Sequence, residues 1–221
     1  MGRLGSFVIS NEGKGTMKNV FVGVCLLGLT SAVLAQEPSG FMVGGGLSLD
    51  RGDFGEQLED EFQAFVSQDI TTDDDGFDTG LDAYIGYAFG GASSLRFGYR
   101  KFGEQSGDIN VSGLGFGGYS VEADGTYLAA DLLFPLSENF YLGGTLGLQN
   151  WDGDITLSAP GVRDRLSEDG RDFFFGLRTK YLINEGRAAL VASYNRYSFE
   201  VEGGDDLKYS SLQLGLEAYF F

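Results

Sequence analysis

The last eleven residues of the chain read Ser211-Leu-Gln-Leu-Gly-Leu-Glu-Ala-Tyr-Phe-Phe221. Successive side chains of a β-strand point to opposite faces, so an extended segment with this sequence has one apolar and one more polar face. The apolar face carries Leu212, Leu214, Leu216, Ala218 and Phe220, and the other carries Gln213, Gly215, Glu217 and Tyr219. The pattern predicts a two-faced strand whose apolar side contacts either a protein core or lipid.

The same alternation recurs in seven earlier segments, and no helical period persists after Gly40. The expected strands are 40–49, 79–89, 94–102, 119–134, 140–151, 171–183, 188–201 and 211–221. The links after the second, fourth and sixth strands are short. The other links, 50–78, 103–118, 152–170 and 202–206, are expected to be loops. Short turns on one rim and longer loops on the other predict an all-β, eight-stranded antiparallel up-and-down barrel.

Charge is divided unequally between the two faces of these strands. The face opposite the apolar one carries glycines and a lumen charge cluster, which consists of Asp82, Arg96, Arg100, Asp131, Arg178, Lys180 and Glu217. A soluble barrel of the lipocalin kind has the opposite arrangement. The sequence therefore predicts a transmembrane barrel with a polar lumen and a lipid-facing exterior. Aromatic residues near the short-link ends match an interfacial girdle, namely Tyr87, Phe89, Phe134, Phe140, Tyr181 and Phe220.

The lumen charges have two interpretations. An eight-stranded barrel encloses little more than its own side chains, so the charged residues are expected to pair with one another and fill the interior. The alternative is a conduction path lined by the same residues.

The N-terminal region resembles an export signal. Residues 17–35 begin with a basic region at Lys18, continue with an apolar run, and end with small residues before a cleavage position after Ala35. The apolar run is about half the roughly 20 residues that a spanning helix needs. We expect 1–16 to be an extension that precedes the true start, 17–35 to be a removed signal peptide, and 36–221 to form the barrel.

Composition excludes several functions. The formal net charge of −17 disfavours nucleic acid as a partner. The chain has no histidine, and its one cysteine, Cys25, lies in the predicted signal, so Ser-His catalysis and histidine-bound metals are not expected. The glycines of 113–118 match the spacing of a dinucleotide-binding loop, but no helix follows them, so we interpret this stretch as a loop. The sequence predicts neither an enzyme nor a cofactor.

Two stretches resemble the small outer-membrane barrels of the OmpA and OmpX type. They are Tyr127-Leu-Ala-Ala-Asp-Leu-Leu-Phe-Pro-Leu-Ser-Glu-Asn-Phe-Tyr-Leu142 and Leu214-Gly-Leu-Glu-Ala-Tyr-Phe220. The resemblance implies a monomer in the outer membrane with both barrel termini in the periplasm. It also implies that the terminal stretch is the signal read by the barrel assembly machinery, through Leu214, Gly215, Leu216, Tyr219 and Phe220. Phe221 departs from the family pattern, which ends at the aromatic residue.

The first long link is strongly acidic. Asp73, Asp75 and Asp78 are weak candidates for a calcium site, since hard cations bind several carboxylate oxygens on a tight turn. The spacing does not fit an EF-hand, so a solvated acidic loop is the expectation, with divalent cations bridging it to lipopolysaccharide phosphates.

These observations predict a non-enzymatic outer-membrane barrel that supports envelope integrity and presents acidic loops for surface interaction. Outer-membrane lipid, lipopolysaccharide and the assembly machinery are the expected partners, with divalent cations and host surface molecules as further candidates. The alternative function is a narrow porin-like channel for ions or small solutes.

Overall fold

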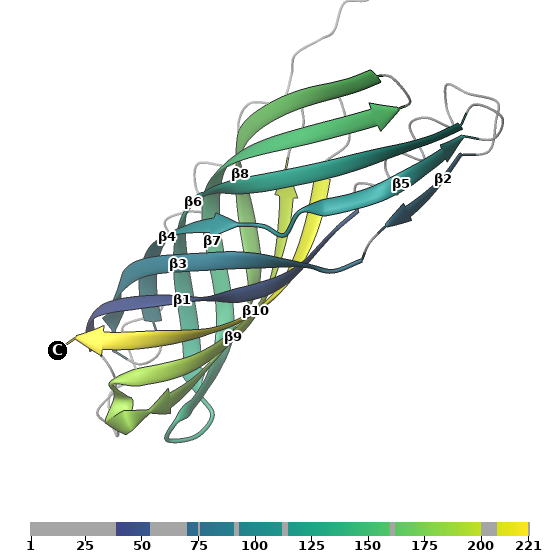
Figure 1. Ribbon diagram of the computed structural model, residues 1–221. Coiled ribbons are helices and arrows are strands. Elements are labelled where there is room, and N and C mark those ends of the chain that lie inside the picture. The colour runs from purple at the N-terminus through teal and green to yellow at the C-terminus, as the bar shows by residue number, and fades with distance from the viewer. Residues whose placement is uncertain are drawn as a thin grey trace, which may run out of the picture. The chain divides into compact units, whose positions relative to one another are not determined.

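The computed structural model describes residues 39–53, 70–74, 76–90, 93–111, 115–159, 162–199 and 207–220, all within the compact unit Leu34–Phe221. These residues form one antiparallel sheet (Figure 1). Its strands are β1 Ser39–Gly52, β2 Ile70–Asp74, β3 Asp78–Phe89, β4 Ser93–Lys101, β5 Gln105–Val111, β6 Gly115–Pro135, β7 Phe140–Ala159, β8 Val162–Ile183, β9 Ala188–Phe199 and β10 Leu207–Phe220. The predicted extension 1–16, the predicted signal 17–35 and Phe221 lie outside the described residues.

Eight of the strands close into a barrel, as predicted. The first strand, β1, pairs with β10 on one side and with β3 on the other, so Phe41 lies opposite both Phe220 and Tyr87. Closure is completed by the pairing of β6 with β7, from Gly118 opposite Ser158 to Pro135 opposite Tyr141. The terminal strand, β10, therefore lies between β1 and β9, and its backbone is hydrogen-bonded on both edges.

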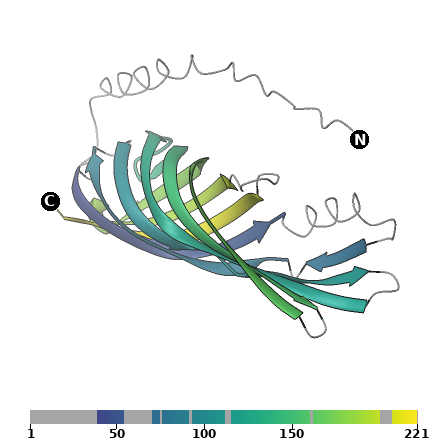
Figure 2. The same cartoon turned by 90° about the horizontal axis from the view of Figure 1, so that it is seen from above.

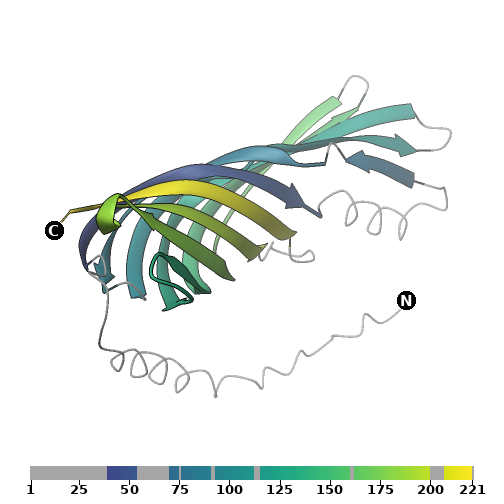
Figure 3. The same cartoon turned by 90° about the horizontal axis from the view of Figure 1, so that it is seen from below.

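Three of the predicted loops are wrong in part, because the sheet continues beyond the barrel at the long-loop rim (Figures 2 and 3). The predicted loop 103–118 contains β5, which pairs with the first residues of β6. The predicted loop 50–78 contains β2, which pairs with β5. The predicted loop 152–170 is a hairpin in which Ala159 lies opposite Val162. One side of this extension carries a small buried apolar cluster of Tyr119, Val121 and Ile155, and the other side is polar. This is the reverse of the lipid-facing strands, so the pattern that marks those strands ends where the extension begins.

The barrel has an apolar exterior, and we name its outward-facing apolar surface the apolar belt. Its side chains are largely exposed, for example Ile85 at 63%, Phe175 at 63% and Leu214 at 65%. A continuous surface of this kind needs lipid as its solvent. From Phe41 to Leu49, eight residue steps at ~3.4 Å and a tilt of ~40° give a height of ~20 Å, close to the ~25 Å apolar band of outer-membrane barrels.

The predicted aromatic girdle lies at the short-turn end of the belt. Five of its members are exposed, and Phe140 is half-buried. Phe41 belongs to the same group, with its ring centroid 5.5 Å from that of Tyr87, although the sequence pattern did not identify it. None of the helical segments in the described part of the chain is long and apolar enough to cross a membrane.

The interior of the barrel has three layers. Toward the short turns, the lumen is filled by apolar and tyrosine side chains such as Met42, Leu133 and Tyr141. The middle layer is charged. Toward the long-loop rim, aromatic rings close the barrel, and they belong to Phe102, Trp151, Phe174, Tyr197, Phe199 and Tyr209.

Two glycines make room for tyrosines in the charged layer. A Cβ atom on Gly44 would collide with the ring of Tyr84, and one on Gly98 would collide with the ring of Tyr127. Each glycine lies directly opposite its tyrosine on the adjacent strand, so the ring can lie across the glycine and turn its hydroxyl toward the charges.

Candidate functional site in the barrel lumen

The structure places all seven residues of the lumen charge cluster inside the barrel. They come from β3, β4, β6, β8 and β10, and each is only 1–3% exposed. Their inward orientation follows from the alternation of the strands, because every one of them sits between two outward-facing neighbours. Burial of this many charges requires that each finds a partner.

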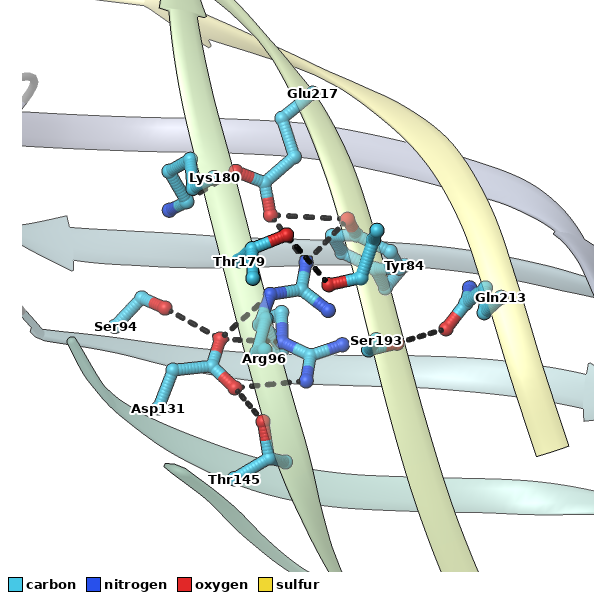
Figure 4. A network of polar contacts seen from close by, with 12 residues as sticks. Tyr84, Ser94, Arg96, Asp131, Thr145, Thr179, Lys180, Ser193, Gln213 and Glu217 are labelled. Atoms are coloured by element: carbon cyan, nitrogen blue, oxygen red, sulfur yellow. Dashed lines mark hydrogen bonds and ion pairs between the residues drawn. The ribbon is translucent and has the colours of Figure 1, made fainter. Parts of the chain in front are cut away.

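Asp131 is the first centre of the network (Figure 4). Arg96 contacts both of its carboxylate oxygens, with Nε 2.7 Å from Oδ2 and Nη2 2.9 Å from Oδ1. The hydroxyls of Ser94 and Thr145 donate to the same carboxylate at 2.7 Å each. The Arg178 Nε lies 3.6 Å from Oδ2. Two arginines and two hydroxyls thus compensate the desolvation of one carboxylate.

Glu217 is the second centre (Figure 4). Its Oε1 lies 2.6 Å from Nη2 of Arg178 and its Oε2 lies 3.0 Å from Nζ of Lys180. The hydroxyl of Tyr84 donates to Oε1 at 2.9 Å, and the hydroxyl of Tyr219 donates to Oε2. Because Arg178 contacts both carboxylates, the two centres form one network that spans the barrel from β4 to β10.

Arg100 pairs outside this network, with a residue that the sequence analysis assigned to the acidic loop. Asp50 lies in β1, is fully buried, and has Oδ1 2.9 Å from Nη2 of Arg100. Its Oδ2 accepts from the hydroxyl of Ser48 at 2.9 Å and from the backbone N–H of Gly103 at 3.0 Å. The placement of Asp50 in a solvated loop is therefore wrong. The signal was present, because Asp50 continues the inward alternation of Ser48.

Asp82 has hydroxyl and amide partners in place of a cation. It accepts from the hydroxyl of Tyr127 at 2.9 Å and from the side-chain amide of Gln213. With Asp50 included, the buried residues of the described strands contain four cations and four carboxylates. The middle layer is thus electrically balanced.

The metal candidates of the first link are not brought together in the described structure. The backbone of Asp73 lies in β2 opposite Asp108, Asp75 lies outside the described residues, and Asp78 begins β3 opposite Asp50. Within the described residues, no group of three or more histidine, cysteine, aspartate or glutamate side chains is arranged to hold a metal ion.

The predicted assembly signal occupies the end of β10. Leu214, Leu216 and Phe220 face outward and are 57–65% exposed, and Tyr219 faces the lumen with 5% exposure. Gly215 lies opposite Gly46 of β1. The segment therefore presents alternate apolar residues along the outside of the barrel.

A closed barrel with a lipid-facing exterior and a charge-paired interior defines an integral β-barrel protein of the outer membrane. Residues 21–220 match the family described as the outer membrane protein beta-barrel domain, and the chain belongs to this family. A comparison with curated proteins gives no match.

Several solved structures have a similar fold. The attachment invasion locus protein Ail of Yersinia pestis is 15% identical, with 83% of this chain and 99% of that chain covered and a TM-score of 0.49. A second structure of Ail, in complex with the heparin analogue sucrose octasulfate, is 15% identical over 83% and 99% of the two chains with a TM-score of 0.47. The outer membrane protein OprG of Pseudomonas aeruginosa is 15% identical over 84% and 98%, with a TM-score of 0.44.

Proposed function

We propose that this chain is a monomeric, non-enzymatic barrel that supports the integrity of the outer membrane and presents an acidic surface to the outside. Residues 17–35 export it and are removed, and the end of β10 is read by the barrel assembly machinery. The short turns and both barrel termini face the periplasm. The acidic long-loop rim faces outward, where lipopolysaccharide, divalent cations and host surface molecules are its partners.

The filled lumen is the observation that carries this proposal. The charges of the middle layer are paired at 2.6–3.0 Å in the contacts of Arg96, Arg100, Arg178 and Lys180 with carboxylates. Aromatic rings in edge or tilted contact at 4.9–5.5 Å lie above them, among them Phe102, Trp151 and Phe199. A packed interior of this kind favours a structural and surface role over solute transport.

The outward orientation of the long-loop rim is supported by its extent and composition. Outer-membrane barrels have short periplasmic turns and longer extracellular loops. Here the short rim consists of the links around Gly90, Ser137 and Glu185, and the opposite rim carries the sheet extension.

A liposome-swelling assay tests the closed lumen against the channel alternative. Proteoliposomes that contain the purified protein are expected to swell in small sugars and amino acids at the rate of protein-free liposomes. A known porin reconstituted at the same density is the positive control. Swelling that rises with the amount of reconstituted protein would favour the narrow channel.

A further inference from the structure

Three basic side chains gather on the outer face of β1, β9 and β10. Arg51 and Arg196 lie opposite Ser210, one on each side of it, and Lys208 is the next outward-facing residue on the same strand as Ser210. All three basic side chains are exposed. We name Arg51, Arg196 and Lys208 the basic cluster.

The basic cluster lies at the long-loop edge of the apolar belt. The outward-facing residue two positions before Arg51 is Leu49, and the one two positions before Arg196 is Tyr194, and both are exposed members of the belt. The cations therefore begin at the height where acyl chains end and headgroups start. Neighbouring strands are ~4.8 Å apart, so the Cα atoms of Arg51 and Arg196 are ~10 Å apart, and their long side chains can approach one phosphate from two sides.

Within the part of the chain that the structure describes, the cluster keeps most of its charge without an ion-pair partner. No ion pair in the described part of the chain joins Arg51, Arg196 or Lys208 to a carboxylate. Among the described residues, one acidic residue is adjacent: Asp53 Oδ1 accepts from the backbone N–H of Lys208 at 2.9 Å. With Asp53 counted, the formal charge of these four residues is +2. The hydroxyl of Tyr194 donates to Oγ of Ser210 at 3.3 Å and places a further polar group at the same edge.

The opposite side of the long-loop rim is acidic. An open depression of about 290 Å³ there is lined by Glu122, Asp124, Asp152, Asp154, Glu168 and Asp169, together with Gly153 and Ser167. Hydrogen bonds from Arg165 and Ser167 lower the pKa of Asp154, so its carboxylate is charged at neutral pH. On this side Arg165 is paired with Asp154 at 2.6 Å, whereas the basic cluster has no such ion pair among the described residues.

We propose that the basic cluster binds the phosphate groups of lipopolysaccharide in the outer leaflet. Arginine forms bidentate contacts with phosphate, and each lysine or arginine near an anionic membrane surface contributes to the attraction. The cluster presents this chemistry beside the acyl chains that cover the belt. The inference rests on the outward orientation in the proposed function, because the inverted barrel would place the cluster at the inner leaflet.

Native mass spectrometry of the detergent-solubilised protein tests this site, with bisphosphorylated lipid A and dephosphorylated lipid A as probes. The site variant is Arg51→Gln/Arg196→Gln/Lys208→Gln. The control variant Lys101→Gln/Arg163→Gln/Arg187→Gln removes the same charge at exposed positions elsewhere. We expect the wild type and the control to bind bisphosphorylated lipid A, and the site variant to bind it at least about tenfold more weakly. Dephosphorylated lipid A is expected to bind all three equally weakly.

Three other outcomes would contradict the proposed lipid site, and none of them depends on the orientation of the barrel in the membrane. Equal binding by the site and control variants would show that binding depends only on net charge. Equal binding of both lipids would show that the phosphate groups are not recognised. Absence of binding by the wild type would also overturn the site. Cysteine labelling of the two rims in intact cells decides the orientation separately, so the two failures are distinguishable. Gel migration of folded protein checks that the variants form the barrel.

Discussion

Arg178 of β8 and Glu217 of β10 form an ion pair with Nη2 2.6 Å from Oε1, and both side chains are shielded from solvent to within 1%. The strand between them, β9, contributes no charge to the pair. The contact therefore passes over β9 on the lumen side and ties the terminal strand to the charged middle layer. It is also the contact that joins the two carboxylate centres of the network.

Removal of Glu217 should destabilise the barrel strongly. Glu217→Ala leaves Arg178 and Lys180 with reduced compensation in a buried site, and loss of one partner of a buried pair costs about 3–5 kcal/mol. Urea unfolding in lipid vesicles, followed by the fluorescence of the single tryptophan, Trp151, measures the free energy of unfolding. The exposed Glu185→Ala should change it by less than about 0.5 kcal/mol. Equal effects of the two variants would show that the pair is not structural.

Asp50 should act as a structural residue and not as a calcium ligand. Asp50→Ala removes the partner of Arg100 and an acceptor for the N–H of Gly103, so we expect a loss of about 3 kcal/mol in unfolding free energy. The loss should be the same in calcium and in EDTA. The exposed Glu104→Ala is the matched control. A loss seen only in calcium would place Asp50 in a metal site.

The end of β10 should control membrane assembly. Deletion of Phe220 and Phe221 removes the last outward-facing aromatic residue of the strand, so we expect much less folded protein in the outer membrane. Deletion of Glu59 and Asp60 from the acidic first link removes the same number of residues. Fractionation followed by heat-modifiable gel migration compares the two. Equal losses would contradict an assembly signal in this strand.

The two rims should differ in their exposure on intact cells. Arg163→Cys lies on the extension at the long-loop rim and Ser137→Cys lies in a short turn, and both positions are exposed. A membrane-impermeant maleimide is expected to label only the first in intact cells and both after permeabilisation, with the parent chain showing any label at Cys25. The reverse labelling pattern would show that the short turns, and not the long-loop rim, face the outside of the cell.

The barrel was predictable because each lipid-facing strand alternates with high contrast. From Leu81 to Phe89, for example, every second residue is apolar and the intervening ones are aspartate, tyrosine, glycine and alanine. The extension was not predicted because the lipid-facing pattern ends there. Val121 lies opposite Ile155 in a small buried cluster, and the residues on the other side of these strands are polar, so the alternation is the reverse of that in the lipid-facing strands.

The sequence predicted which charged residues face the lumen, but not which of them contact one another. The alternation of inward-facing and outward-facing positions identified seven of the eight buried charged residues. Asp50, the eighth, was not identified because it was expected to lie in the loop that follows the first strand. Which carboxylate meets which cation depends on the stagger of strands around the barrel, and sequence periodicity contains no information on that stagger. Arg178 and Glu217, 39 residues apart, meet across β9, although the strand register places Gln213 and not Glu217 in line with Arg178.

Planar-bilayer recording tests the closed lumen most directly. Because Arg96, Asp131, Arg178 and Glu217 fill the middle layer, the wild-type protein is expected to give no steady channel openings in symmetric salt. Steady openings in the wild type, with a conductance that changes in Arg96→Ala or Asp131→Ala, would contradict the account and show that ions pass through the charge network.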